Sequence, residues 1–453
     1  MNKDRYFFKV TDRKIMMIVI SLICLFSILL LYKLGTVPKE FVDEQSYMDE
    51  VKSLVYTGTD LNNLARPIYF KGPFGNGQSI TYALFAVPFI KFAGFSVFKF
   101  RLPMVLLTII NIVLILLYLN KKSVSKSILF WVTLSFIAAP WVFISSRWVL
   151  DCNIAPITLS IGVTTLLFAI ELELTAIQKF ILLTVSALFI TFSVYGYIAG
   201  WIFIPIFLLL FLIYLLRIKQ LSLKWLLVYI GEIGIMCLPL IVFAYHLVIL
   251  RSTKNTTWGP FSLPGMSMQR GSSFIDFNDG DGIIHAMIIN VINGIQTYMQ
   301  GFDHLAWNSV EGFGMIFPIL LVFALIGIFT PKLFLSQRQF LFKCILCLAL
   351  ISYVPSLLIV KPNFNHWTFL NMVLILLAGY GLYYASLVFG KKYSMAMVII
   401  VFVLSFVFIT HFYFNNDSYF VKGSSMTSKR YLYRSNVGKI PAKKIKWLDN
   451  IEK

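Results

Sequence analysis

The residues best suited to chemistry are two adjacent carboxylates, Asp43 and Glu44, which follow the first strongly apolar run. A carboxylate held at a bilayer surface, partly shielded from water, has its pKa raised toward the range of a general base. Adjacent carboxylates on one chain point in different directions, so one can react while the other positions a partner. The alternative is a solvated helix start, because acidic residues stabilise the first turn of a helix.

A glycine-rich segment follows, in which Lys71 stands beside Gly72, Gly75 and Gly77 and ahead of an apolar helix predicted from about Ser79. Free backbone amides at a helix N-terminus, together with a nearby cation, can bind an anion such as a phosphate. A plain loop is the alternative for this segment. No Walker motif is present, which argues against nucleotide hydrolysis.

Other residues are weaker candidates for chemistry. The five histidines show no metal-ligand spacing, so the sequence predicts no metal site. Cys344 and Cys347 lie inside an apolar run and are expected to be small core residues. Glu232 stands within an apolar run, where an ionised side chain is costly. We expect it to make an interhelical hydrogen bond.

These residues belong to a chain with the composition of a membrane protein. Of its 453 residues, 58% are hydrophobic and 13% are charged, with a mean hydropathy of +0.81. A soluble domain carries about 25% charged residues. The formal net charge is +19, and the basic residues cluster between the apolar runs. That placement suits anionic headgroups and membrane topology, so nucleic-acid binding is not expected.

The apolar runs approach the roughly 20 residues that cross a bilayer, and they predict about eleven transmembrane helices. The first run, 15–32, is long enough to stay as an anchor rather than a cleaved signal peptide. The uncharged run 180–216 is too long for one helix, and the turn-forming stretch from Tyr195 to Trp201 is expected to divide it. The predicted fold class is an all-α polytopic membrane protein.

The positions of Lys and Arg orient these helices. Basic residues concentrate in the N-terminal tail and in alternate connections, which places the N-terminal tail in the cytoplasm. A first loop, 33–101, containing interfacial helices, and a second loop, 251–312, then lie outside. The predicted transmembrane domain covers 1–416, and a short basic extracytoplasmic tail covers 417–453.

The order of several motifs resembles a known family. The motifs in the first part of the chain are the Asp-Glu pair, Phe70-Lys71-Gly72-Pro73 before an interfacial helix, Phe92-Ala93-Gly94, and Phe100-Arg101-Leu102-Pro103 opening a span. This order is similar to that of the bacterial GT-C glycosyltransferases of the protein O-mannosyltransferase and lipid A aminoarabinose transferase types. The strings from Ser145 to Asn153 and from Asn363 to Trp367 resemble a Gram-positive branch.

The resemblance implies transfer of a sugar from a polyprenyl-phosphate donor to an extracytoplasmic acceptor, which is a cell-wall polymer, a lipid or a protein. It implies Asp43 as the general base and Glu44 as a group that orients the acceptor or the loop. The cations that would hold the phosphate are Lys71, Arg66, Arg147, Arg270 and His366. No cofactor is expected, and since a polyprenyl phosphate leaves as a stable anion, no metal is required in principle.

A multi-pass transporter, or a flippase for lipid or polysaccharide, is the alternative function. Such a protein needs ionisable residues or broken helices near the bilayer midplane, and the predicted spans carry few of them. The favoured interpretation is an enzyme of the cytoplasmic membrane whose active site faces outside. Its expected partners are the polyprenyl-phosphate sugar, the acceptor and membrane lipids.

Overall fold

The protein is a helical bundle, seen in a computed structural model that describes residues 12–72, 75, 77–120, 126–266, 273–275 and 282–423. Within these residues, eight helices are long and apolar enough to cross a membrane, or up to nine if a bent pair counts as one span. These eight helices are α1 (Asp12–Leu31), α4 (Val97–Leu119), α7 (Asp151–Glu171), α8 (Ala176–Gly196), α9 (Gly200–Arg217), α10 (Leu223–Ala244), α13 (Gln337–Ile359) and α14 (Thr368–Val407). The predicted all-α polytopic fold class is therefore confirmed.

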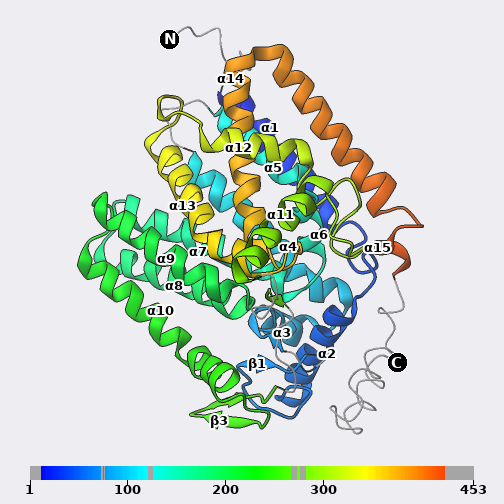
Figure 1. Ribbon diagram of the computed structural model, residues 1–453, viewed down its shortest axis with the longest axis vertical. Coiled ribbons are helices and arrows are strands. Elements are labelled where there is room, and N and C mark those ends of the chain that lie inside the picture. The colour runs from blue at the N-terminus through cyan, green and yellow to red at the C-terminus, as the bar shows by residue number, and fades with distance from the viewer. Residues whose placement is uncertain are drawn as a thin grey trace.

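Breaks in several helices have local causes. The bent pair is α5 (Ser127–Ala138) and α6 (Pro140–Arg147), which meet at 61°. Pro140 stands at the start of α6, where its missing N–H is tolerated and the preceding helix cannot continue through it. In α14, Gly390 adopts a φ of 77° and divides the helix. The part beyond Gly390 runs along the right margin of the bundle (Figure 1).

The predicted division of 180–216 is confirmed, because α8 ends at Gly196 and α9 begins at Gly200. A shorter apolar helix, α12 (Pro318–Ile328), packs against α14. A Cβ on Gly381 would lie 1.8 Å from the carbonyl oxygen of Phe323, so only glycine permits this close crossing. The count of about eleven spans stays a prediction.

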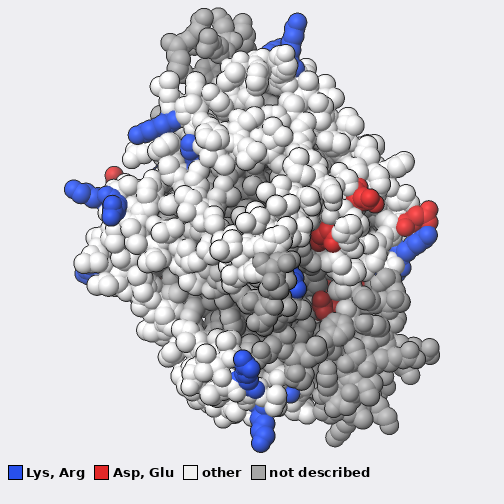
Figure 2. Space-filling view, viewed as in Figure 1, with Lys and Arg blue, Asp and Glu red and all other residues white. Residues whose placement is uncertain are grey.

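The surface of the bundle is largely apolar. Large hydrophobic side chains are exposed on α1, α8, α10 and both parts of α14. Figure 2 shows a broad uncharged area over most of this face, with basic side chains mainly along its left and lower edges and acidic side chains mainly in its right half. A contiguous apolar surface of this size is typical of contact with lipid. The chain is a multi-pass membrane protein.

The short elements of the first predicted outer loop and the β3–β4 hairpin lie at the lower end of the bundle in Figure 1. The first predicted outer loop contains α2 (Val42–Thr57), the antiparallel pair β1 (Tyr69–Phe70) and β2 (Gln78–Ser79), and α3 (Thr81–Ala93). The π-helix η2 (Tyr245–Ile249) leads into the second predicted outer loop, which contains the hairpin β3 (Thr256–Trp258) and β4 (Phe261–Leu263), and α11 (Ile283–Gln300). The remaining short helices are η4 (Lys332–Phe334), η5 (Phe408–Tyr413) and α15 (Tyr419–Lys422). The helix expected from about Ser79 is present as α3, and α2 is a further helix of the same loop. The interfacial placement and the domain boundaries stay predictions.

Candidate active site

Asp43 lies in the first turn of α2, a helix that is buried along most of its length. Its side chain is half-buried, and its backbone carbonyl accepts a hydrogen bond from Nε2 of Gln78 at 2.8 Å. This bond fixes the start of α2 against β2. The positive end of the helix dipole favours a carboxylate at this position. The structure therefore presents Asp43 on a fixed backbone at the start of α2.

Glu44, the neighbouring acid, is completely buried and forms a bidentate pair with Arg101 of α4. Nε of Arg101 lies 2.8 Å from Oε1, and Nη2 lies 2.5 Å from Oε2. The N–H of Val149 also donates to Oε1 at 3.1 Å. Burial raises the pKa of the Glu44 carboxyl, while the Arg101 guanidinium acts in the opposite direction. Glu44 thus joins α2 to α4, and its role in orienting the acceptor or the loop stays a prediction.

The same junction reaches two further segments. Nη1 of Arg101 donates to the carbonyl of Leu34, which lies between α1 and α2. Phe41, directly ahead of α2, packs on Trp148 with ring centroids 5.8 Å apart. Four segments therefore meet around the residue next to Asp43: the end of α1, the start of α2, the start of α4 and the turn before α7.

Arg147 is also completely buried, and the chain itself uses all of its donors. A guanidinium has five N–H donors. They are directed at the carbonyls of Leu29, Leu30, Tyr32 and Val37 and at the hydroxyl of Tyr413. The last carbonyls of a helix lack intrahelical partners, so Arg147 caps α1 and holds the turn after it. In this arrangement all five donors face groups of the chain itself, and the contact with the donor phosphate that the resemblance implies stays a prediction.

Lys71 lies at the tip between β1 and β2, where its carbonyl accepts a bond from the N–H of Gly77 at 2.9 Å. Gly72 and Gly77 adopt φ values of 70° and 91°, so the tight tip depends on glycine there. Among the described residues, none pairs with the Lys71 ammonium by a hydrogen bond or an ion pair. Its half-buried side chain therefore remains a candidate for binding an anion.

The other three predicted cations differ in their surroundings. Arg66 is exposed, and its backbone carbonyl accepts a bond from Ser262 of β4. His366 lies in the turn before α14, with Nδ1 3.0 Å from the carbonyl oxygen of Lys361 and Nε2 3.4 Å from Oγ of Ser273. Arg270 lies outside the described residues. The His366 ring therefore lies within hydrogen-bond distance of Lys361 and Ser273, whereas the Arg66 side chain is exposed.

Several residues that the sequence did not assign lie at the same junction. Asp151 is the first residue of α7, two positions after the Val149 that bonds to Glu44. In the described part of the chain, Oε1 of Gln45, Oε1 of Gln78 and Nε1 of Trp148 are buried without a hydrogen-bond partner. An unsatisfied buried polar group costs about 1–3 kcal/mol, and such groups mark places where a substrate hydroxyl can bond. The signal available in the sequence was position alone: Gln45 follows the acid pair and Gln78 follows the glycine cluster.

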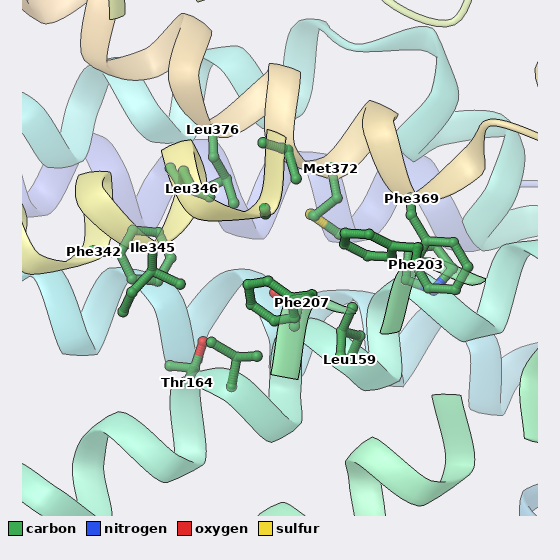
Figure 3. Close-up of a pocket in the computed structure, with 15 residues that line it drawn as sticks. Leu159, Thr164, Phe203, Phe207, Phe342, Ile345, Leu346, Phe369, Met372 and Leu376 are labelled. Carbon is green, nitrogen blue, oxygen red and sulfur yellow. The ribbon is translucent and has the colours of Figure 1, made fainter. Parts of the chain in front are cut away.

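An apolar cavity of about 60 Å³ lies deeper in the bundle, between α7, α9, α13 and α14. Figure 3 shows the rings of Phe203, Phe207 and Phe369 on one side of it and Phe342 on another, with Met372 above them. Nearly all of its lining is hydrocarbon. This cavity suits an alkyl chain rather than a polar group.

Among the residues that the structure describes, no group of three or more His, Cys, Asp and Glu side chains could hold a metal ion.

Comparison with known proteins identifies the fold. No protein-family model matches the sequence, and no curated protein matches it significantly. Two crystal structures of ArnT from Cupriavidus metallidurans are similar to it. The apo structure has a TM-score of 0.52 at 11% identity, covering 84% of this chain and 62% of that one. The structure bound to undecaprenyl phosphate has a TM-score of 0.53 at 11% identity, covering 85% and 63%. The chain has a GT-C fold.

This chain therefore spans about three fifths of the length of the ArnT chains that it matches. Archaeal oligosaccharyltransferase AglB from Archaeoglobus fulgidus, in complex with an inhibitory peptide and a dolichol-phosphate, is a more distant match. Its TM-score is 0.48 at 13% identity, covering 86% of this chain and 56% of that one. The predicted GT-C fold is confirmed, while the Gram-positive branch and the O-mannosyltransferase subtype stay predictions.

Proposed function

We propose that this GT-C chain is a membrane glycosyltransferase that moves a sugar from a polyprenyl-phosphate donor to an extracytoplasmic acceptor, with Asp43 as the general base. The acceptor is a cell-wall polymer, a lipid or a protein. One observation carries the proposal: the half-buried Asp43 stands beside the buried Glu44–Arg101 pair, where four segments meet. The fold shared with an ArnT structure that holds undecaprenyl phosphate supports a lipid-linked donor.

In this reaction Asp43 takes the proton of an acceptor hydroxyl as the oxygen attacks the anomeric carbon of the sugar. The bond between that carbon and the donor phosphate breaks, and polyprenyl phosphate leaves with the electron pair. Attack opposite the leaving group inverts the anomeric centre. Fixing the backbone on both sides of Asp43 serves this step, because a base must stay within hydrogen-bond reach of the proton it takes.

The departing phosphate needs positive charge, and Lys71 is the cation whose surroundings best support that role. Lys71 is half-buried at a glycine-rich tip, and β1 and β2 connect that tip to Gln78, the residue bonded to Asp43. Arg66, Arg270 and His366 remain further candidates to hold the phosphate. A charge-assisted contact to the developing phosphate charge lowers the barrier to its departure.

The lipid part of the donor needs an apolar path beside the reaction centre. The cavity between α7, α9, α13 and α14 is lined almost entirely by hydrocarbon. Asp151 begins α7, so this helix runs from the proposed reaction centre to the cavity. We therefore assign part of the polyprenyl chain to this cavity.

The transporter alternative gains no specific support. Glu232 of α10 accepts a hydrogen bond from Oγ1 of Thr184 of α8 at 2.6 Å. This is the interhelical bond that the sequence predicts, and it gives the intramembrane carboxyl a structural role.

The proposal is tested by incorporation of sugar in proteoliposomes. Purified full-length protein is supplied with radiolabelled polyprenyl-phosphate sugars and with wall polymer, lipid or protein acceptors. The wild type should transfer label, the Asp43→Asn variant should lose this activity, and Glu40→Gln, which changes a carboxyl ahead of α2, should retain it. If the wild type carries sugar across the bilayer and forms no new glycosidic bond, the transporter is the correct function.

A further inference from the structure

A polar pocket lies at the end of the bundle opposite Asp43. Helix α7 starts beside the proposed active site and ends at Glu171, and its 21 residues extend about 30 Å at 1.5 Å per residue. At this far end, residues from α7, α9, η4 and α13, with the turn after α9, surround a cavity of about 450 Å³. Its polar lining includes Glu171, Lys332, Arg338 and Gln220.

This pocket contains more hydrogen-bond donors than the carboxylate of Glu171 can accept from. One oxygen of Glu171 accepts from the hydroxyl of Tyr118, and the other lies 2.5 Å from Nε of Arg338. Both carboxylate oxygens are thereby occupied. Among the described residues, Glu171 is the ion-pair partner that the structure gives Arg338. The outer nitrogens of Arg338, the exposed ammonium of Lys332 and the Gln220 amide remain able to bind an acceptor group.

The rest of the lining is hydrocarbon. Ile170, Ile218 and Leu341 face the cavity beside these donors. Two large apolar side chains nearby, Phe329 and Leu333, are 77% and 76% exposed on either side of Lys332. A free inorganic anion needs no such apolar surface, whereas a phospholipid presents a phosphate next to acyl chains.

The surrounding charge is positive. Figure 2 shows several basic side chains, with an acidic side chain among them, along the left and upper left margin, where Figure 1 places the end of α9 and the beginning of α13. Arg217, Lys219 and Lys224 flank the connection between α9 and α10. Basic residues concentrate on the cytoplasmic side of membrane proteins, and the lipids of that leaflet are enriched in negative charge.

We propose that this pocket is a binding site for an anionic phospholipid of the cytoplasmic leaflet. The lipid phosphate binds between Arg338 and Lys332, and an acyl chain follows Ile170 and Leu341 along the wall. Because residues of α7, α9 and α13 all contribute, a bound lipid joins these helices at the end remote from the reaction. The site does not depend on the transferase activity proposed above.

The test is lipid binding by the full-length protein in detergent, measured by native mass spectrometry. The probes are phosphatidylglycerol, phosphatidylcholine and soluble glycerol 3-phosphate. The variants are Lys332→Ala, Arg338→Ala and the double variant, with Lys391→Ala as the control because Lys391 is an exposed lysine on α14 outside the pocket. Since each basic residue near a lipid surface contributes roughly a fivefold factor in affinity, the double variant should bind phosphatidylglycerol about 25-fold more weakly.

Lys332→Ala keeps the proposal testable if Arg338→Ala fails to fold, because the Lys332 side chain is exposed and Arg338 pairs with Glu171. The expected result is preference for phosphatidylglycerol over phosphatidylcholine, weakened by Lys332→Ala and unchanged by Lys391→Ala. Equal binding of both lipids, or equal weakening by Lys391→Ala, would overturn the site. Binding of glycerol 3-phosphate as tight as that of the lipid would show a free-phosphate site instead and refute the assignment to lipid.

Discussion

We expect the buried ion pair between Glu44 and Arg101 to contribute more to the stability of the candidate site than any other single interaction there. Both side chains are 0% exposed, and three hydrogen bonds reach the carboxylate. Glu44→Gln leaves the Arg101 charge buried without its carboxylate, and breaking a buried pair in this way costs about 3–5 kcal/mol. Arg101→Gln leaves the Glu44 carboxylate buried without its guanidinium, and it should lower the free energy of unfolding by a similar amount. Independent effects would sum to roughly 6–10 kcal/mol in the double variant.

The double variant Glu44→Gln with Arg101→Gln is expected to cost no more than the worse single change, since it buries no lone charge. Thermal unfolding midpoints in lipid nanodiscs measure this coupling, with Glu311→Gln as a control expected to unfold near the wild type because Glu311 is exposed. Additive losses in the double variant, or single variants as stable as the wild type, would refute the assigned role of this pair.

The same variants separate positioning from proton transfer. Glu44→Gln should lower sugar transfer by displacing Asp43, but the remaining activity should keep the wild-type dependence on pH because Asp43 remains the proposed base. Loss of the acidic limb in the Glu44→Gln profile would instead make Glu44 the base.

Three further predictions follow from the placement of cations. Lys71→Ala removes a charge-assisted contact worth about 1.5–3 kcal/mol, so the apparent donor KM should rise at least tenfold, and an unchanged KM would exclude Lys71 from the phosphate. Arg147→Lys offers three donors in place of five and should lower the unfolding midpoint while leaving the donor KM unchanged; a raised KM at wild-type stability would restore its predicted contact with the donor. In a cysteine-free background, an impermeant thiol reagent should label Lys254→Cys in intact cells and Lys219→Cys only after permeabilisation, and the reverse pattern would invert the topology.

The helices were predictable because their signal is local. Length and hydrophobicity alone locate α1, α7 and α13, and the turn-forming stretch from Tyr195 to Trp201 marks the break between α8 and α9. The kink at Gly390 and the bend before α6 also have local causes, a glycine with positive φ and a proline. The GT-C fold itself came from the order of motifs in the first part of the chain.

The partners of the charged residues were not predictable in the same way. Glu44 and Arg101 are 57 residues apart in sequence, and nothing local says that they pair. The sequence shows Arg147 as a cation near the predicted outer surface, but not that the end of α1 presents carbonyls to it. The unpartnered oxygens of Gln45 and Gln78 likewise depend on packing. Sequence therefore named the candidate site residues, and packing shows which of them are bonded to other groups of the chain.

The central claim is that Asp43 accepts the proton of the acceptor, and the most direct test is the pH dependence of sugar transfer by Asp43→Asn. Asparagine keeps the shape of aspartate but cannot take the proton, so turnover should fall by roughly 10²–10⁴. The donor KM should stay near that of the wild type, and the acidic limb of the wild-type profile should be absent from the residual activity. An Asp43→Asn enzyme that keeps most of its turnover and the same acidic limb would contradict the account.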